Sequence, residues 1–174
     1  MGKSVLTCVA VLFMAVAEAA VTMPHVFGDN MVLQQGQKVP VWGKADPGEK
    51  VTVSFAGQTV SATADAAGRW KLFLAPLVAS SEGRRLEAST STFHLHLDNV
   101  VVGEVWFCSG QSNMEFPMGG LPWDATRRIK DSEREIAAAK HPLLRHFKSP
   151  RKVSDVPLDD VDAKWELTTP ETVA

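Results

Sequence analysis

One serine lies in a segment whose composition suits nucleophilic chemistry. Residues 105–108 form the apolar run Val-Trp-Phe-Cys, and the run Gly-Gln-Ser-Asn-Met follows at residues 110–114. We expect the apolar run to be a strand buried on both faces, as in a parallel α/β sheet. Such sheets bind ligands beyond the carboxyl ends of their strands, which is where Ser112 would stand. Ser112 is therefore the candidate nucleophile.

The neighbours of Ser112 suit a tight turn. Gly110 allows the backbone to bend sharply, and polar Gln111 and Asn113 are placed to bond nearby backbone groups and hold the loop. The nucleophile elbow of α/β-hydrolases, Gly-x-Ser-x-Gly, requires a small residue two positions after the serine, but Met114 stands there. The segment thus predicts a nucleophile on a different kind of turn, with an ordinary turn serine as the alternative.

Other polar clusters have simpler explanations. His94 and His96 would share one face of a strand, but no third zinc ligand accompanies them, so a solvated face is favoured. Asp159, Asp160 and Asp162 lack the glycine and the terminal glutamate of an EF-hand, and a solvated acidic loop is favoured. We therefore expect no metal site.

The tryptophans divide into two groups. Trp42, Trp70 and Trp106 are expected in hydrophobic cores, the usual place for large aromatic side chains. Trp123 follows Pro122 in the loop after Ser112. It is the tryptophan best placed to face a substrate.

The chain is expected to form two folding units. In residues 21–101, short runs of β-forming residues alternate with turn signals such as Asp-Pro-Gly at 46–48, which predicts an antiparallel β-sandwich. In residues 102–174, an apolar strand, a loop, a helix from Asp124 to about Lys140 and a strand at 143–147 predict the opening of a doubly wound α/β sheet.

The first twenty residues predict a secretory signal peptide. Lys3 precedes an uncharged apolar run at residues 5–17, and Ala-Glu-Ala at residues 17–19 has the form of a cleavage signal. A buried or anchoring helix is the alternative, but the run is shorter than the roughly 20 residues that cross a bilayer. We expect residues 1–20 to be removed, no stable membrane insertion, and delivery through the secretory pathway to the extracellular space or a lysosome-like lumen.

Charge and cysteine content argue against a nucleic-acid partner and against a disulfide framework. The net charge is −2 and the basic residues occur as isolated pairs, so no nucleic-acid partner is expected. Cys8 would leave with the signal peptide, which makes a disulfide framework absent from this sequence. Cys108 is expected either to be a buried thiol or to pair with a cysteine outside the 174 residues.

Several segments together resemble one enzyme family. Residues 103–106 and 110–114 are similar to the nucleophile block of sialate O-acetylesterases and related SGNH acetylesterases. Further similarity lies upstream and downstream, in order along the chain, at residues 27–34, 41–43, 66–70, 135–139, 157–160 and 164–165. The resemblance implies the N-terminal part of such an enzyme, with the second unit a flavodoxin-like, three-layer SGNH domain that is incomplete at the C-terminus.

The resemblance also implies an activity. These enzymes remove O-acetyl groups from sialic acids or related sugars without a cofactor. Ser112 would be the nucleophile, and Gly110, Gln111 and Asn113 would form the oxyanion or supporting loop. The family's Asp-x-x-His block does not occur in this sequence, and neither His141 nor His146 lies in such a pattern. The alternative is a non-catalytic secreted β-sandwich protein that binds carbohydrate or protein.

Overall fold

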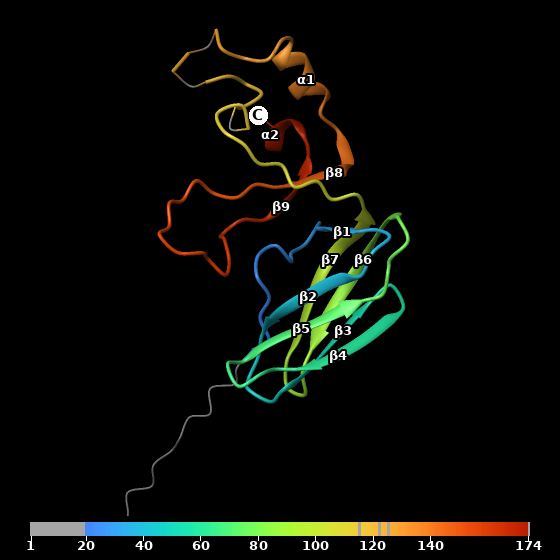
Figure 1. The fold of residues 1–174 in the computed structure, drawn as a ribbon. Coiled ribbons are helices and arrows are strands. Elements are labelled where there is room, and N and C mark those ends of the chain that lie inside the picture. The colour runs from blue at the N-terminus through green and yellow to red at the C-terminus, as the bar shows by residue number, and fades with distance from the viewer. Residues whose placement is uncertain (1–19, 115, 122, 125, 174) are drawn as a thin grey trace, which may run out of the picture.

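The computed structural model describes residues 20–173 except 115, 122 and 125. The regular elements among the described residues are mainly strands, with two short helices (Figure 1). The expected signal peptide lies outside the described residues, apart from Ala20. No helix in the described part of the chain is long and apolar enough to span a membrane.

The first unit contains seven strands in two sheets. Five form one sheet in the order β1-β7-β6-β3-β4, and β2 and β5 form a separate two-stranded ribbon. Their bounds are β1 Val32–Gln34, β2 Val39–Lys44, β3 Lys50–Phe55, β4 Gln58–Thr63, β5 Arg69–Leu74, β6 Ser80–Ser89 and β7 His94–Gly103. The expected unit boundary between residues 101 and 102 falls inside β7.

The expectation of a purely antiparallel sheet was wrong at one edge. β1 pairs with β7 in parallel, with Val32 opposite Val101. Two parallel strands that are neighbours in a sheet need a long connection, and strands β2 to β6 supply it here. The remaining pairs, β3–β4, β3–β6 and β6–β7, are antiparallel as expected.

The two sheets share one hydrophobic core. In β3 the side chains of Val51, Val53 and Phe55 are buried and the alternate residues are not, which is the period-two pattern of a half-buried strand. Buried residues of β2, β5, β6 and β7 join the same cluster. The predicted hairpin at residues 56–58 is confirmed, because Ala56 and Gly57 both have positive φ, the backbone of the tight turns that join β-hairpins.

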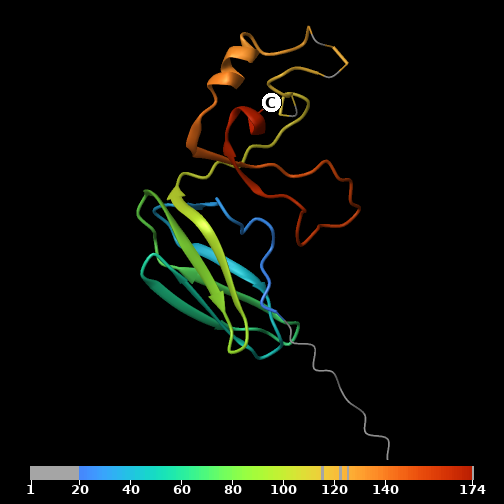
Figure 2. The same ribbon diagram turned by 180° about the vertical axis from the view of Figure 1, so that it is seen from behind.

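The second unit differs from the expected parallel α/β layout. Helix α1 is Ser132–Ala138, β8 is His141–Phe147, β9 is Trp165–Thr168 and α2 is Pro170–Val173. β8 pairs with β9 in antiparallel fashion, in a sheet of its own (Figure 2). A parallel pair requires a crossover packed on the sheet, but residues 148–164 form an extended loop without a helix.

The helix predicted from Asp124 starts later than expected. The Asp124 carboxylate accepts hydrogen bonds from the Thr126 backbone N–H at 3.1 Å and from the Thr126 hydroxyl at 2.6 Å, which closes a local turn instead of capping a helix. Helix α1 begins after Asp131, whose φ of 57° is left-handed. The thin apolar stripe leaves residues 126–131 little core to pack against, so they do not extend the helix.

Candidate functional site

The apolar run before Ser112 is not a buried strand. β7 ends at Gly103, and residues 104–114 are all exposed. Trp106 is 83% exposed and Phe107 is 94% exposed, so the expectation of a core position for Trp106 was wrong. A run that is apolar on both faces becomes a strand only where neighbouring strands pair with it, and no strand among the described residues does so.

Two glutamines at the end of β1 hold this segment as it leaves β7. The Gln34 side chain donates to Glu104 at 3.2 Å and accepts from the Val105 backbone N–H at 2.8 Å. The Gln35 side chain also donates to Glu104. The hydrogen bond from Gln35, followed by that from Gln34, holds the pKa of Glu104 below its usual value. The sequence marked Gln34 through family resemblance, but it did not indicate this role.

Ser112 lies in an exposed turn. The Met114 backbone N–H donates to the Gln111 carbonyl at 2.9 Å and closes the turn over Ser112. Gly110 is required for space: a Cβ there would lie 2.7 Å from Met114 Cγ. Asn113 is exposed like its neighbours. The Ser112 hydroxyl makes no hydrogen bond with the described residues, so it is accessible and no described base activates it.

Each histidine near a carboxylate has a partner other than Ser112. His25 Nδ1 lies 2.7 Å from Asp160, and His146 Nε2 lies 3.6 Å from Glu166. His141 is the exposed first residue of β8. In the part of the chain that the structure describes, therefore, no imidazole hydrogen-bonds to the hydroxyl of Ser112.

The remaining sequence candidates occupy varied positions. His94 and His96 lie on one exposed face of β7. Trp70 is buried as expected, whereas Trp42 is 36% exposed. Trp123 is 78% exposed, in keeping with a loop open to solvent.

The acidic loop and Cys108 were the other candidates for a metal site or a buried thiol. Asp160 lies in the loop before β9, and no group of three or more metal-ligating side chains occurs among the described residues. Cys108 is an exposed free thiol, so the buried alternative was wrong.

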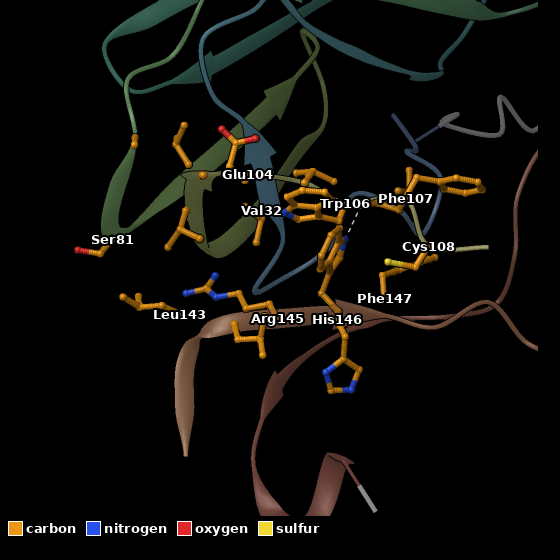
Figure 3. A pocket seen from close by; sticks show the side chains of 18 of the residues that line it. Val32, Ser81, Glu104, Trp106, Phe107, Cys108, Leu143, Arg145, His146 and Phe147 are labelled. Carbon is orange, nitrogen blue, oxygen red and sulfur yellow. Dashed lines mark hydrogen bonds between the residues drawn. The ribbon is translucent and has the colours of Figure 1, made fainter. Parts of the chain in front are cut away.

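A cavity of about 920 Å³ lies between the end of β7 and the β8–β9 sheet (Figure 3). Its lining is largely apolar and includes Val32, Val101, Trp106, Leu143 and Trp165. The cavity wall reaches Cys108, four residues before the candidate nucleophile, but Ser112 does not line it. The structure thus brings the apolar run, and not the serine itself, to this space.

Arg145 joins the two units beside the cavity. Its guanidinium donates to the backbone carbonyls of Asn30, Met31 and Asn99, at 2.9 Å for Asn30. Burial lowers the pKa of this guanidinium. Trp165 of β9 makes a second link through its indole N–H, which donates to the Val26 carbonyl at 2.8 Å. Neither link was foreseen, because Arg145 reaches the Asn30 carbonyl across 115 residues of sequence and Trp165 reaches the Val26 carbonyl across 139.

Comparison with known proteins decides the relationship. The sialate O-acetylesterase of Mus musculus is 30% identical over 155 residues, which cover 81% of this chain and 27% of that protein. The chain is a homologue of the sialate O-acetylesterases. The enzyme of Homo sapiens is 27% identical over 158 residues, covering 83% of the chain and 29% of its own length. No protein-family model matches the chain.

A solved structure supports the same relationship. The crystal structure of a carbohydrate acetylesterase from Xanthomonas citri superposes with a TM-score of 0.80 at 33% identity, covering 88% of this chain and 34% of that protein. The resemblance expected from the sequence segments is therefore confirmed. The homologue described here spans between a quarter and a third of the length of the curated relatives it matches.

Proposed function

We propose that this sialate O-acetylesterase homologue contributes Ser112 as the nucleophile of an esterase that removes O-acetyl groups from sialic acids or related sugars. The observation that carries the proposal is the exposed turn at residues 110–114, with its free serine hydroxyl, in a chain similar to carbohydrate acetylesterases. Gly110, Gln111 and Asn113 would form the loop around the oxyanion, and Trp123 would face the sugar.

The proposed reaction has two steps. The Ser112 oxygen adds to the acetyl carbonyl carbon while an imidazole takes the hydroxyl proton. The ester C–O bond then breaks, and the sugar hydroxyl leaves with that proton. Water, deprotonated by the same imidazole, releases acetate and restores the serine. Backbone N–H groups at the turn would stabilise the negatively charged oxygen of each tetrahedral intermediate.

We further propose that the imidazole and its carboxylate partner come from polypeptide outside these 174 residues. A serine hydroxyl is a poor nucleophile without an adjacent base, and loss of triad members costs about 10⁴- to 10⁶-fold in turnover. The absence of an imidazole bonded to Ser112 among the described residues supports this proposal. An incomplete SGNH-type second unit and a cleaved signal peptide at residues 1–20 belong to the same proposal.

The test uses protein isolated from its native source, where any polypeptide that completes the site is present. A fluorophosphonate should label the peptide that contains Ser112, as read by mass spectrometry, and the protein should hydrolyse 4-nitrophenyl acetate. Replacement of Ser112 by alanine should abolish both signals. The matched control is Ser109→Ala, since Ser109 is also exposed, three residues earlier. Unchanged turnover in the Ser112 variant would reject the proposal.

A second candidate is a non-catalytic secreted protein that binds carbohydrate or protein. The unactivated state of Ser112 in the described residues favours it. This candidate would be supported over the esterase if native protein did not react with the fluorophosphonate but was retained on a column of immobilised carbohydrate.

A further inference from the structure

The outer face of the β2–β5 ribbon carries aromatic and cationic side chains. Alternate residues of both strands point into the core, and the intervening ones point outward. We call the outward set the ribbon face: Pro40, Trp42, Lys44, Arg69, Lys71 and Phe73. The ribbon lies toward the viewer in Figure 1, away from the segment that carries Ser112.

Two aromatic rings form an open surface there. Phe73 is 51% exposed and Trp42 is 36% exposed, although both belong to strands whose other face is fully buried. Phe27 packs edge-on against Trp42, with ring centroids 4.6 Å apart and planes at 77°, and so restricts the indole ring. Exposed aromatic side chains gathered on one face mark binding surfaces more often than scattered ones do.

Lys71 supplies a positive charge over the Phe73 ring that no described carboxylate pairs with. It lies directly opposite Trp42 in the strand register, and its Nζ is 5.3 Å from the centroid of Phe73. The other two cations have partners, since Arg69 pairs with Asp65 at 3.2 Å and Lys44 lies 3.9 Å from Asp159. Lys71 forms no ion pair with any residue that the structure describes.

We infer that the ribbon face binds an acidic carbohydrate. The C–H face of a sugar ring is apolar and stacks on an aromatic ring, while the hydroxyl groups around its rim stay in water. A sugar carboxylate beside that ring forms a charge-assisted hydrogen bond with the Lys71 ammonium group. A neutral sugar uses only the rings, and an acidic peptide uses only the charge. An acidic sugar therefore matches both features at once.

The test is a titration of the ¹⁵N-labelled chain, followed by NMR of the indole N–H groups. Sialyllactose should shift the Trp42 signal saturably and leave that of Trp106, in the exposed segment after β7, unchanged. Lactose, which lacks the carboxylate, should bind about tenfold more weakly. Lys71→Gln should weaken sialyllactose binding about tenfold and remove its advantage over lactose. Phe73→Ala should weaken binding of both sugars.

The matched control is Lys50→Gln, because Lys50 is an exposed lysine of β3 outside the ribbon face. It should bind like the unaltered chain. An unshifted Trp42 signal at millimolar sialyllactose would overturn the inference, as would equal affinity in the Lys71 and Phe73 variants. Equal shifts from a glutamate hexapeptide would also overturn it in favour of a general anion surface. The site is independent of Ser112, so Ser112→Ala should bind sialyllactose normally even if the esterase proposal fails.

Discussion

The guanidinium of Arg145 lies 2.9 Å from the backbone carbonyl oxygen of Asn30. It also donates to the side chain of Asn99 at 3.2 Å, and Asn99 donates to the Asn30 side chain at 2.7 Å. Both asparagines have left-handed backbone, with φ of 66° and 55°, which asparagine tolerates better than most residues. One arginine of β8 therefore ties the second unit to two bends of the first, one in the turn before β1 and one within β7.

Loss of this tie should destabilise the chain. Arg145→Met should lower the free energy of unfolding by about 1–3 kcal/mol, because the carbonyl groups lose a charged donor. Arg145→Lys should recover only part of that loss, since one ammonium group cannot fork across several acceptors. Urea unfolding and hydrogen exchange of β8 measure the effect. Arg127→Met is the control, as Arg127 makes an exposed ion pair with Asp124. Equal losses in Arg145→Met and Arg127→Met would contradict the role of Arg145.

Asp160 should make the contact between the loop before β9 and the N-terminal segment sensitive to acid. Burial opposes its ionisation, but hydrogen bonds from the His25 backbone and ring hold the pKa of Asp160 below its ordinary value of 3.8. A carboxylate with a lowered folded pKa stabilises fully above the unfolded pKa, and this stabilisation is lost as pH falls through the folded value.

Asp160→Asn should accordingly be destabilising near neutral pH and nearly silent once the pH falls below the folded pKa of Asp160, which lies under 3.8. Thermal unfolding across this pH range measures the difference from the unaltered chain. Asp159→Asn is the matched control, because Asp159 is exposed and lies 3.9 Å from its nearest cation. A destabilisation by Asp160→Asn that is the same at all pH values would contradict the predicted link between stability and ionisation of Asp160.

Gly43 should be intolerant of any side chain. A Cβ at this position would lie 1.9 Å from the Thr22 carbonyl oxygen and 2.9 Å from the Trp70 ring. The backbone N–H and the carbonyl of Thr22 both hydrogen-bond to the backbone of Lys44, so Thr22 cannot move without loss of these two bonds. Gly43→Ala should cost about 3 kcal/mol or more in chemical denaturation. Gly103→Ala should be nearly neutral, since its nearest contact would be an ordinary 3.7 Å to Val32.

The turn at Ser112 should depend on the space above Gly110. In Gly110→Ala the new methyl group would displace Met114, whose backbone closes the turn. Fluorophosphonate labelling of Ser112 in native protein should slow about tenfold or more, because small displacements of a nucleophile are costly. Adding Met114→Ala to Gly110→Ala should restore much of the rate. If the double variant stays as slow as the single one, the steric explanation is wrong.

The purified chain should self-associate through its exposed apolar residues. Phe107 is 94% exposed and Leu144 is 61% exposed, and both border the cavity between the units. Exposed apolar surface of this kind drives association. Serine at both positions should lower the concentration-dependent light scattering of the chain. Phe93→Ser, at the far end of β7, should leave the scattering unchanged. A monomeric unaltered chain at high concentration would refute this prediction.

Local sequence patterns determined most of the first unit. The alternation in β3 and the turn at residues 56–58 specify a half-buried strand and a hairpin, because each depends on neighbours a few residues apart. The Gly-Gln-Ser-Asn-Met run likewise indicated an exposed turn at Ser112, and the family relationship was legible from short segments in order along the chain.

Tertiary structure decided what depends on distant partners. The apolar run at residues 105–108 is exposed because burial of a strand needs neighbours, and its own composition cannot provide them. β1 pairs in parallel with β7, and β8 pairs in antiparallel fashion with β9, because strand direction is set by the path of the connecting chain. The position of Arg145 at the Asn30 carbonyl has the same origin. Backbone carbonyls occur at every residue, so sequence alone does not say which ones fold into reach of a guanidinium.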